Sequence, residues 1–265
     1  MAYVHMDFWS EVLHQNIDVD VLLPETRHRE KTPFGDKKFK VLYLLHGGGM
    51  NGTCWNRWSR IEQYVAGSDL VVVMPTAHLS FYCNMVHGAN YFKYFTEELP
   101  TVIKNYFPVS DKREDTYVAG LSMGGHGSLL LGLRRPDLYA GIGAMSCGRD
   151  WSIPIEGEPE NKAAPRYNSL GTVEEFKGSH ADIWQAVRDL KDYEGELPRI
   201  YHCCGKQDVH YESSCDFRDF VQNEAKYLDY TFTDGDGAHN FDYWDWKIQE
   251  ILRYFDLVNN GQKMS

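Results

Sequence analysis

The chain has 265 residues, of which 43% are hydrophobic and 25% charged, a balance that excludes a disordered protein and supplies enough apolar material for one large core. Its formal net charge of -11, from 27 basic and 38 acidic side chains, argues against nucleic acid or an anionic membrane surface as a main partner. No apolar run reaches membrane-spanning length, and residues 1–15 lack the basic start and apolar stretch of a signal peptide.

The six cysteines show no metal-ligand spacing. Cys203 and Cys204 are adjacent, which suits neither an ordinary disulfide nor a CxxC redox site. Reduced thiols in a cytoplasmic protein are the simplest interpretation. Residues 27–40 are rich in Lys and Arg, but they also contain acidic residues, Pro33 and Gly35, so we interpret them as a solvated loop rather than a binding patch.

Along the chain, short β-rich runs alternate with segments of helical period, which is typical of a largely parallel sheet covered by helices on both faces. The runs predict strands at Ile17–Leu23, Phe39–Leu45, Leu70–Met74, Thr116–Leu121, Gly141–Met145, Arg199–Cys204 and Tyr230–Thr233. Helical spacing predicts helices over residues 92–103 with a kink at Pro100, over 124–133, around 217–221 and over 244–255. We therefore expect one α/β domain over residues 1–265.

Residues 150–180 break this rhythm, since they are rich in polar residues, proline and glycine and have no clean period. A loop of that length is uncommon unless it is functional. We interpret the segment as an insertion that lies over the C-terminal edge of the sheet and forms a partial lid. A plain surface excursion is an equally open alternative.

The sharpest motif is Gly-Leu-Ser-Met-Gly at residues 120–124, which places Ser122 between a buried strand and a helix. Such a turn strains the backbone of the serine and projects its hydroxyl away from the sheet. The adjacent helix N-terminus favours negative charge. We therefore predict an α/β-hydrolase fold in which Ser122 is the catalytic nucleophile.

A serine hydroxyl needs a base to take its proton, and in this fold the nucleophile, the acid and the histidine follow one another along the chain. His239 lies between the last predicted strand and the last helix, and Asp208 follows the strand before it. We expect Asp208 to orient His239 and to stabilise its imidazolium.

Other residues could take these two roles. The remaining histidines after Ser122 are His126, His180, His202 and His210. We expect His202, within a strand, and His210, beyond the acid, to be structural. Asp234 or Asp236 could replace Asp208, but both are too close in sequence to His239 to approach it from a separate strand.

His46-Gly-Gly-Gly49 follows an apolar strand directly. Acyl transfer builds negative charge on the carbonyl oxygen, and backbone N–H groups of a glycine loop can approach it closely. We expect the N–H groups of Gly48 and Met123 to form an oxyanion hole. Aromatic residues near strand ends or the insertion are candidates for substrate contact, and we name Trp55, Tyr82 and Trp151, although such residues are more often core.

Asp-Gly-Asp-Gly at residues 234–237 lacks the later glutamate of a calcium loop, and the histidines form no zinc motif, so we expect no metal and no cofactor. In combination, Leu44-Leu45-His46-Gly47, residues 97–100, Gly120–Gly127 and Arg135-Pro136-Asp137 resemble the tributyrin esterase branch of the esterase D family. The late Asp and His share this resemblance, which runs from about residue 18 to residue 255.

The resemblance implies a cytoplasmic serine carboxylesterase for short acyl or aryl esters, acetyl or feruloyl and cinnamoyl among them, with Ser122, Asp208 and His239 as its triad. Two alternatives remain: a thioesterase of the S-formylglutathione hydrolase kind, and a catalytically silent scaffold that binds a ligand. We expect a small-molecule ester as the partner and association into a homo-oligomer, with no nucleic acid or membrane partner.

Overall fold

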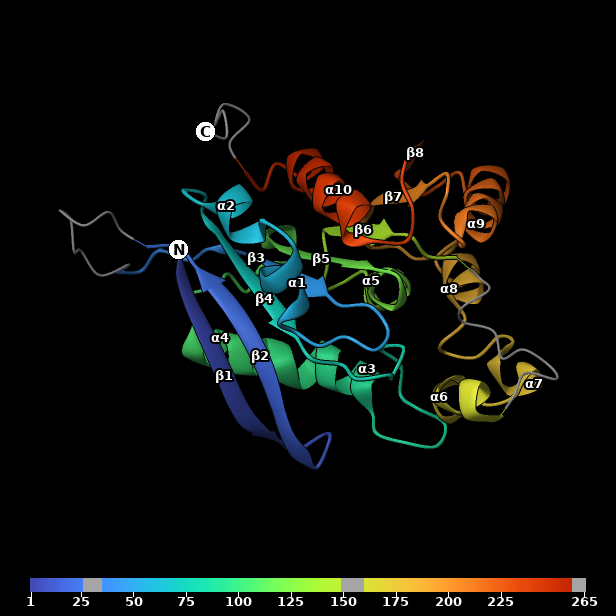
Figure 1. Cartoon of the computed structure of the whole chain (residues 1–265), viewed down its shortest axis with the longest axis horizontal. Coiled ribbons are helices and arrows are strands. Elements are labelled where there is room, and N and C mark those ends of the chain that lie inside the picture. Colours follow the sequence, from blue (N-terminus) through green and yellow to red (C-terminus); the bar gives the residue numbers. More distant parts are fainter. Residues whose placement is uncertain (26–34, 149–159, 259–265) are drawn as a thin grey trace.

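The computed structural model describes residues 1–25, 35–148 and 160–258, with the side chains of residues 160–164 excepted. Its centre is one eight-stranded sheet in the order β1-β2-β4-β3-β5-β6-β7-β8 (Figure 1). The strands are β1 (Ala2–Ser10), β2 (Gln15–Leu23), β3 (Lys40–Leu45), β4 (Leu70–Pro75), β5 (Thr116–Leu121), β6 (Gly141–Met145), β7 (Arg199–Gly205) and β8 (Tyr230–Gly235). The mostly parallel sheet confirms the expected fold class.

Strands β4, β3, β5, β6, β7 and β8 run parallel, whereas β1 and β2 form an antiparallel hairpin that joins β4. Parallel strands end at a common edge of the sheet. The registers show this, since Leu45 pairs with Gly120, Leu121 with Met145, and Gly205 with Gly235. The loops that follow these strands therefore meet in space.

Both faces of the sheet are buried, which explains the continuous apolar runs of its central strands. In β4, Val71 and Val73 belong to one core cluster, and Val72 and Met74 belong to the other. Helices α4, α5, α8 and α9 cover the first face, and α1, α2 and α10 cover the second. The helices are α1 (Cys54–Trp58), α2 (Ile61–Val65), α3 (Tyr91–Lys93), α4 (Leu99–Tyr106), α5 (Met123–Arg134), α6 (Glu160–Leu170), α7 (Val173–Phe176), α8 (Ile183–Asp189), α9 (Tyr211–Glu224) and α10 (Phe241–Tyr254).

Three features differ from the sequence-based expectations. Strand β1 was not expected, and the helix predicted over residues 92–103 contains a π-helical segment (Tyr94–Glu98) between α3 and α4, with Pro100 in the first turn of α4. Residues 160–176, for which no clean period was found, include the helices α6 and α7, and the side chains and N–H groups of Thr172 and Glu175 form a capping box that starts α7. A short 3₁₀ turn, Arg113–Asp115, precedes β5. Within the described residues, no helix is long and apolar enough to cross a membrane.

Candidate active site

Ser122 lies on the sharp turn between β5 and α5. Its backbone has φ 55° and ψ -120°, a left-handed conformation that costs a non-glycine residue about 1–3 kcal/mol. The surroundings enforce it, since the N–H of Ser122 donates to the carbonyl of Met145 at 2.8 Å. A Cβ on Gly124 would lie 2.6 Å from the carbonyl oxygen of His46, so only glycine lets α5 approach β3 this closely. The turn is therefore held by its neighbours, as the motif predicted.

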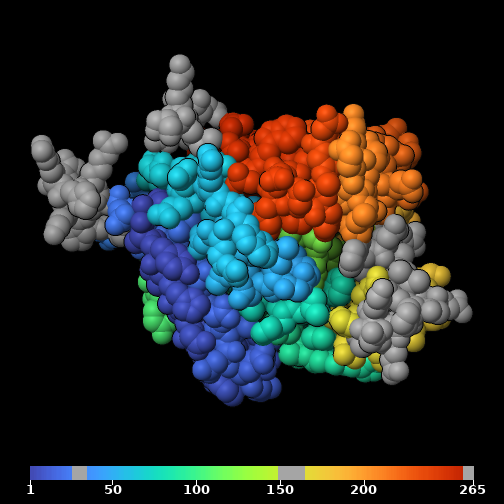
Figure 2. Space-filling model, in the orientation of Figure 1, coloured from blue at the N-terminus to red at the C-terminus, as the bar shows by residue number. Residues whose placement is uncertain are grey.

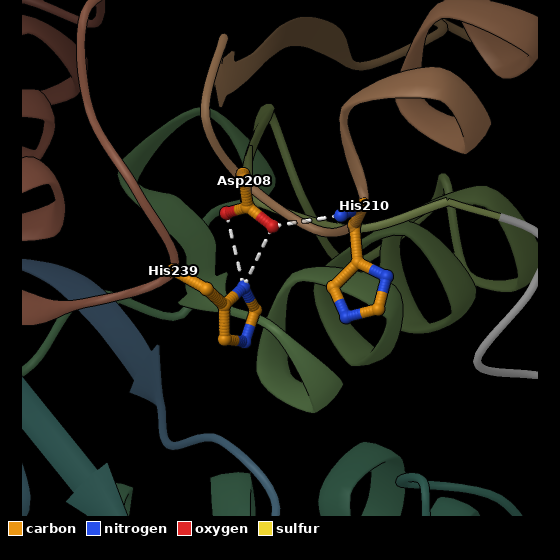
Figure 3. Close-up of side chains that lie close together, drawn as sticks. All are labelled: Asp208, His210 and His239. Carbon is orange, nitrogen blue, oxygen red and sulfur yellow. Dashed lines mark hydrogen bonds and ion pairs between the residues drawn. The ribbon is translucent and has the colours of Figure 1, made fainter.

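The structure brings Ser122, His239 and Asp208 together from the ends of three strands. Nε2 of His239 lies 2.9 Å from Oγ of Ser122. Nδ1 of the same ring lies 3.0 Å from each carboxylate oxygen of Asp208 (Figure 3). In neutral His239, Nδ1–H therefore donates to Asp208, and Nε2 is left to accept the Ser122 hydroxyl proton. This is the arrangement that a serine nucleophile requires.

Asp208 is held in its ionised form. Burial opposes its charge, but hydrogen bonds from His239, from the N–H of His210 and from the hydroxyl of Ser146 outweigh burial and lower the pKa of the carboxyl. The N–H of His210 donates to Oδ1 at 2.8 Å. A carboxylate that stays charged can stabilise an imidazolium beside it.

Two residues at the triad were missed by sequence reasoning. Ser146 follows β6 with φ 54°, is fully buried, and accepts a hydrogen bond from Nε1 of Trp244 at 2.9 Å. The Trp244 ring contacts the His239 ring edge-on, with centroids 4.9 Å apart. Trp244 thus packs against the base while it also holds the serine that bonds to Asp208. The only signal in the sequence was the position of Ser146 directly after a predicted strand.

His210 lies on the other side of His239, with ring centroids 4.9 Å apart and an interplanar angle of 81°. Burial, followed by the nearby charge of His239, lowers the pKa of His210 to about 4, so it stays neutral beside the base. Asp208, His210 and His239 could also hold a metal ion, because their ligand atoms lie within 4.8 Å of one another. An ion there would compete with the hydrogen bonds between Asp208 and His239.

The loop His46–Gly49 lies beside Ser122. A Cβ on Gly47 would be 3.4 Å from Cβ of Ser122, so the loop backbone touches the serine. Nε2 of His46 accepts from the N–H of Ala77 at 2.8 Å, which places the proton on Nδ1, where it donates to the Gly47 carbonyl at 2.7 Å. Burial lowers the pKa of His46 to about 4 and keeps it neutral.

The predicted oxyanion donors, Gly48 and Met123, belong to this loop and to the start of α5. Gly48 is exposed in the loop, and Met123 is the first residue of α5, whose N–H has no acceptor within the helix. Their role as oxyanion donors stays a prediction.

Two of the three predicted substrate contacts need correction. Trp55 and Tyr82 are fully buried, so neither presents a surface to a substrate. Nε1 of Trp55 donates to the carbonyl of Leu45 at 3.1 Å, and the hydroxyl of Tyr82 donates to the carbonyl of His46 at 2.8 Å. They support the base of the loop instead. Trp151 lies outside the described residues.

The other rival residues take no part in the hydrogen bonds of the triad. His126 and His202 are buried, and burial lowers the pKa of each to about 4. His180 packs against the ring of Phe92. The carboxylate of Asp234 accepts from the hydroxyl of Tyr211 at 2.6 Å and is exposed. Asp236 is exposed as well.

The C-terminal end of α6 is fixed to the loop that follows β4. The N–H groups of Val86 and His87 donate to the carbonyls of Ser169 and Asn168, at 3.1 and 2.8 Å. The hydroxyl of Ser169 donates to the carbonyl of Leu79 at 2.8 Å. A Cβ on the nearby Gly48 would lie 3.7 Å from Cδ2 of Leu79, whose side chain is 40% exposed. Leu79 therefore forms an apolar wall beside the glycine loop.

Comparison with known proteins gives the family context. The family model described as "Putative esterase" matches residues 10–255. An acetyl esterase from Caldicellulosiruptor saccharolyticus is 30% identical over 98% of this chain and all of that protein.

Two solved structures from Staphylococcus aureus are also similar. The fluorophosphonate-binding serine hydrolase FphF, with substrate bound, has a TM-score of 0.86 and 29% identity, over 96% of this chain and 98% of that one. The S-formylglutathione hydrolase FrmB, as apoenzyme, has a TM-score of 0.82 and 28% identity over the same shares.

Proposed function

The chain belongs to this esterase family and is a serine carboxylic ester hydrolase, and from the geometry of its site we propose that it cleaves short-chain acyl or aryl esters through an acyl-serine intermediate. The observation that carries the proposal is the unbroken hydrogen-bond chain from Ser122 through His239 to Asp208. It joins a strained serine to a base and the base to an ionised carboxylate.

In the first half of the reaction, Oγ of Ser122 attacks the ester carbonyl while Nε2 of His239 takes its proton. Asp208 stabilises the imidazolium that forms. The N–H groups of Gly48 and Met123 donate hydrogen bonds to the carbonyl oxygen, which becomes negatively charged. As the intermediate collapses, His239 gives the proton to the departing alcohol, and the acyl group stays on Ser122.

In the second half, His239 takes a proton from a water molecule that attacks the acyl-serine. The N–H groups of Gly48 and Met123 again donate hydrogen bonds to the oxyanion of the tetrahedral intermediate. Its collapse releases the carboxylic acid and returns the proton from His239 to Ser122. The same residues act in both halves.

Small acyl groups are supported by the acetyl esterase relative and by Leu79, whose side chain narrows the space beside Gly48. The similarity to FrmB favours a second candidate, the thioester S-formylglutathione, which the same residues would cleave. We also propose a cytoplasmic location, because all six cysteines are unpaired and five of them are buried.

The test is hydrolysis of p-nitrophenyl esters from acetate to octanoate, with methyl ferulate and S-formylglutathione alongside. We expect the highest kcat/KM for acyl chains of about two to four carbons. Ser122→Ala should fold normally and lose about 10⁵-fold or more in kcat, since its hydroxyl is the reacting group. Near wild-type turnover by this variant would refute the assignment. A preference for S-formylglutathione would keep the mechanism and change the substrate.

A further inference from the structure

Strand β1 forms one edge of the sheet. It pairs with β2 over all nine of its residues, and no other strand in the described parts of the chain pairs with its outer side. The hairpin of β1 and β2 lies along the surface, drawn in dark blue in Figure 2. Proteins usually protect such an edge with lysine, proline, a bulge or a very short strand. Ala2–Ser10 contains neither lysine nor proline, and its one-to-one register with β2 has no bulge.

The two faces of β1 differ in character. Val4, Met6 and Phe8 are half-buried and pack against the core. The odd-numbered residues face outward, and two of them are large aromatics, with Tyr3 51% and Trp9 54% exposed. His5 and Asp7, also exposed, lie between them. Along the strand, the exposed face therefore presents an aromatic, a basic, an acidic and a second aromatic side chain.

The exposed face of one β1 strand is complementary to the same face of a second β1 strand that runs in the opposite direction. If a second copy of β1 lies antiparallel with Met6 opposite Met6, all nine residues are paired. His5 then meets Asp7 of the second copy, and Tyr3 meets its Trp9. Each of these pairs occurs twice, and opposite charges and aromatic pairs across strands are both stabilising.

Other registers lose these contacts. A shift by one residue turns the apolar face of one strand outward. A shift by two places Asp7 opposite Asp7, or His5 opposite His5, and leaves two residues of each strand unpaired. Full overlap, charge complementarity and aromatic pairing thus coincide in one register.

The charge on His5 is supported from its own chain. Its Nδ1 lies 2.7 Å from Oδ1 of Asp20, a fully buried carboxylate on β2, and this hydrogen bond raises the pKa of His5. With Nδ1 engaged, Nε2 is the ring nitrogen that remains to meet Asp7 of a second copy.

We propose that two copies of this chain form a dimer in solution through antiparallel pairing of β1 with β1, which joins their two sheets into one. The paired segment would be about 30 Å long, at about 3.3 Å per residue. This face lies on the strand at the far end of the sheet from β8, so the inference does not rest on the proposed function.

The first test is the mass in solution, by light scattering after size exclusion and by analytical ultracentrifugation. We expect the wild type at twice its chain mass of 30.6 kDa. In Asp7→Lys/Trp9→Lys, the dimer dissociation constant should rise by about 100-fold or more, because both charge pairs and both aromatic pairs are lost. The control Asp192→Lys/Tyr106→Lys changes an exposed acid and an exposed aromatic that belong to other elements than β1, and it should remain dimeric. A monomeric wild type, or a dimer that survives in the β1 variant, would overturn the proposal.

The second test fixes the register by cross-linking, in a Cys215→Ser background because Cys215 is the one cysteine that is not buried. Met6→Cys would meet its equivalent about 5 Å away between Cα atoms, within disulfide range. Trp9→Cys would lie about 20 Å from its equivalent. Under mild oxidation we expect a covalent dimer from Met6→Cys and none from Trp9→Cys. A covalent dimer from Trp9→Cys alone would contradict this register.

Discussion

The two sides of the site are held by different kinds of contact. Ser122, His239 and Asp208 form one series of side-chain hydrogen bonds, and each is a link that no other described residue duplicates. The loop His46–Gly49 on the other side is held by the Tyr82 hydroxyl, which donates to the His46 carbonyl, by the Ala77 N–H, which donates to the His46 ring, and by packing. We expect changes in the first group to abolish the reaction, because such residues act as a unit, and changes around the loop to tune it.

Asp208→Asn should interrupt the hydrogen bonds of the triad, and we expect it to reduce activity more than any change except loss of Ser122. An amide at this position cannot stabilise an imidazolium and favours the wrong tautomer of His239. We expect kcat/KM for p-nitrophenyl acetate to fall by about 10³- to 10⁴-fold with the fold retained. Steady-state kinetics and circular dichroism measure the two quantities.

Asp234→Asn is the matched control, since Asp234 precedes His239 closely in sequence but bonds to Tyr211. It should keep kcat/KM within about three-fold of the wild type. A large loss of kcat/KM in this variant, together with a small loss in Asp208→Asn, would show that Asp208 is not the acid of the triad.

The triad could be predicted from sequence because a parallel sheet brings the ends of its strands to one edge. Once Thr116–Leu121, Arg199–Cys204 and Tyr230–Thr233 were identified as strands, the loops after them had to meet. Ser146 and Trp244 could not be assigned in the same way. Their roles depend on a side-chain hydrogen bond and a ring contact that no local pattern encodes.

Strand β1 and the burial of Trp55 and Tyr82 were not predicted from the sequence, for two different reasons. Continuous apolar runs identified the strands with two buried faces, whereas β1 alternates polar and apolar residues and has only one. That period of two was a usable signal. Trp55 and Tyr82 lie near strand ends in the sequence, but burial is a property of the whole packing, so their sequence position did not show that they are inaccessible.

Tyr82→Phe should weaken the support of the glycine loop. It removes the donor to the His46 carbonyl, which is then left buried with one partner fewer. We expect about 1–2 kcal/mol less stability and a kcat about ten-fold lower with KM little changed, because the loop is proposed to act on the charged intermediate. Thermal unfolding and steady-state kinetics measure both.

Tyr94→Phe is the matched control for that change. Tyr94 is also fully buried, but its hydroxyl has no hydrogen-bond partner in the part of the chain that the structure describes. Its removal should leave stability and kcat within error of the wild type or slightly higher. Equal losses in the two variants would show that the Tyr82 hydroxyl has no specific role.

Leu79→Ala should have the smallest effect on rate and a distinct one on selectivity. Because Leu79 lies beside Gly48 and is 40% exposed, its truncation widens the site without opening a core cavity. We expect kcat/KM for octanoate relative to acetate to rise about five-fold, since each methylene that gains or loses a contact changes discrimination by a modest factor. Val86→Ala, an equally exposed apolar residue farther along the same loop, should leave this ratio unchanged. A uniform drop for all chain lengths in Leu79→Ala would mean that the residue supports the glycine loop, as Tyr82 does, rather than bounding the acyl group.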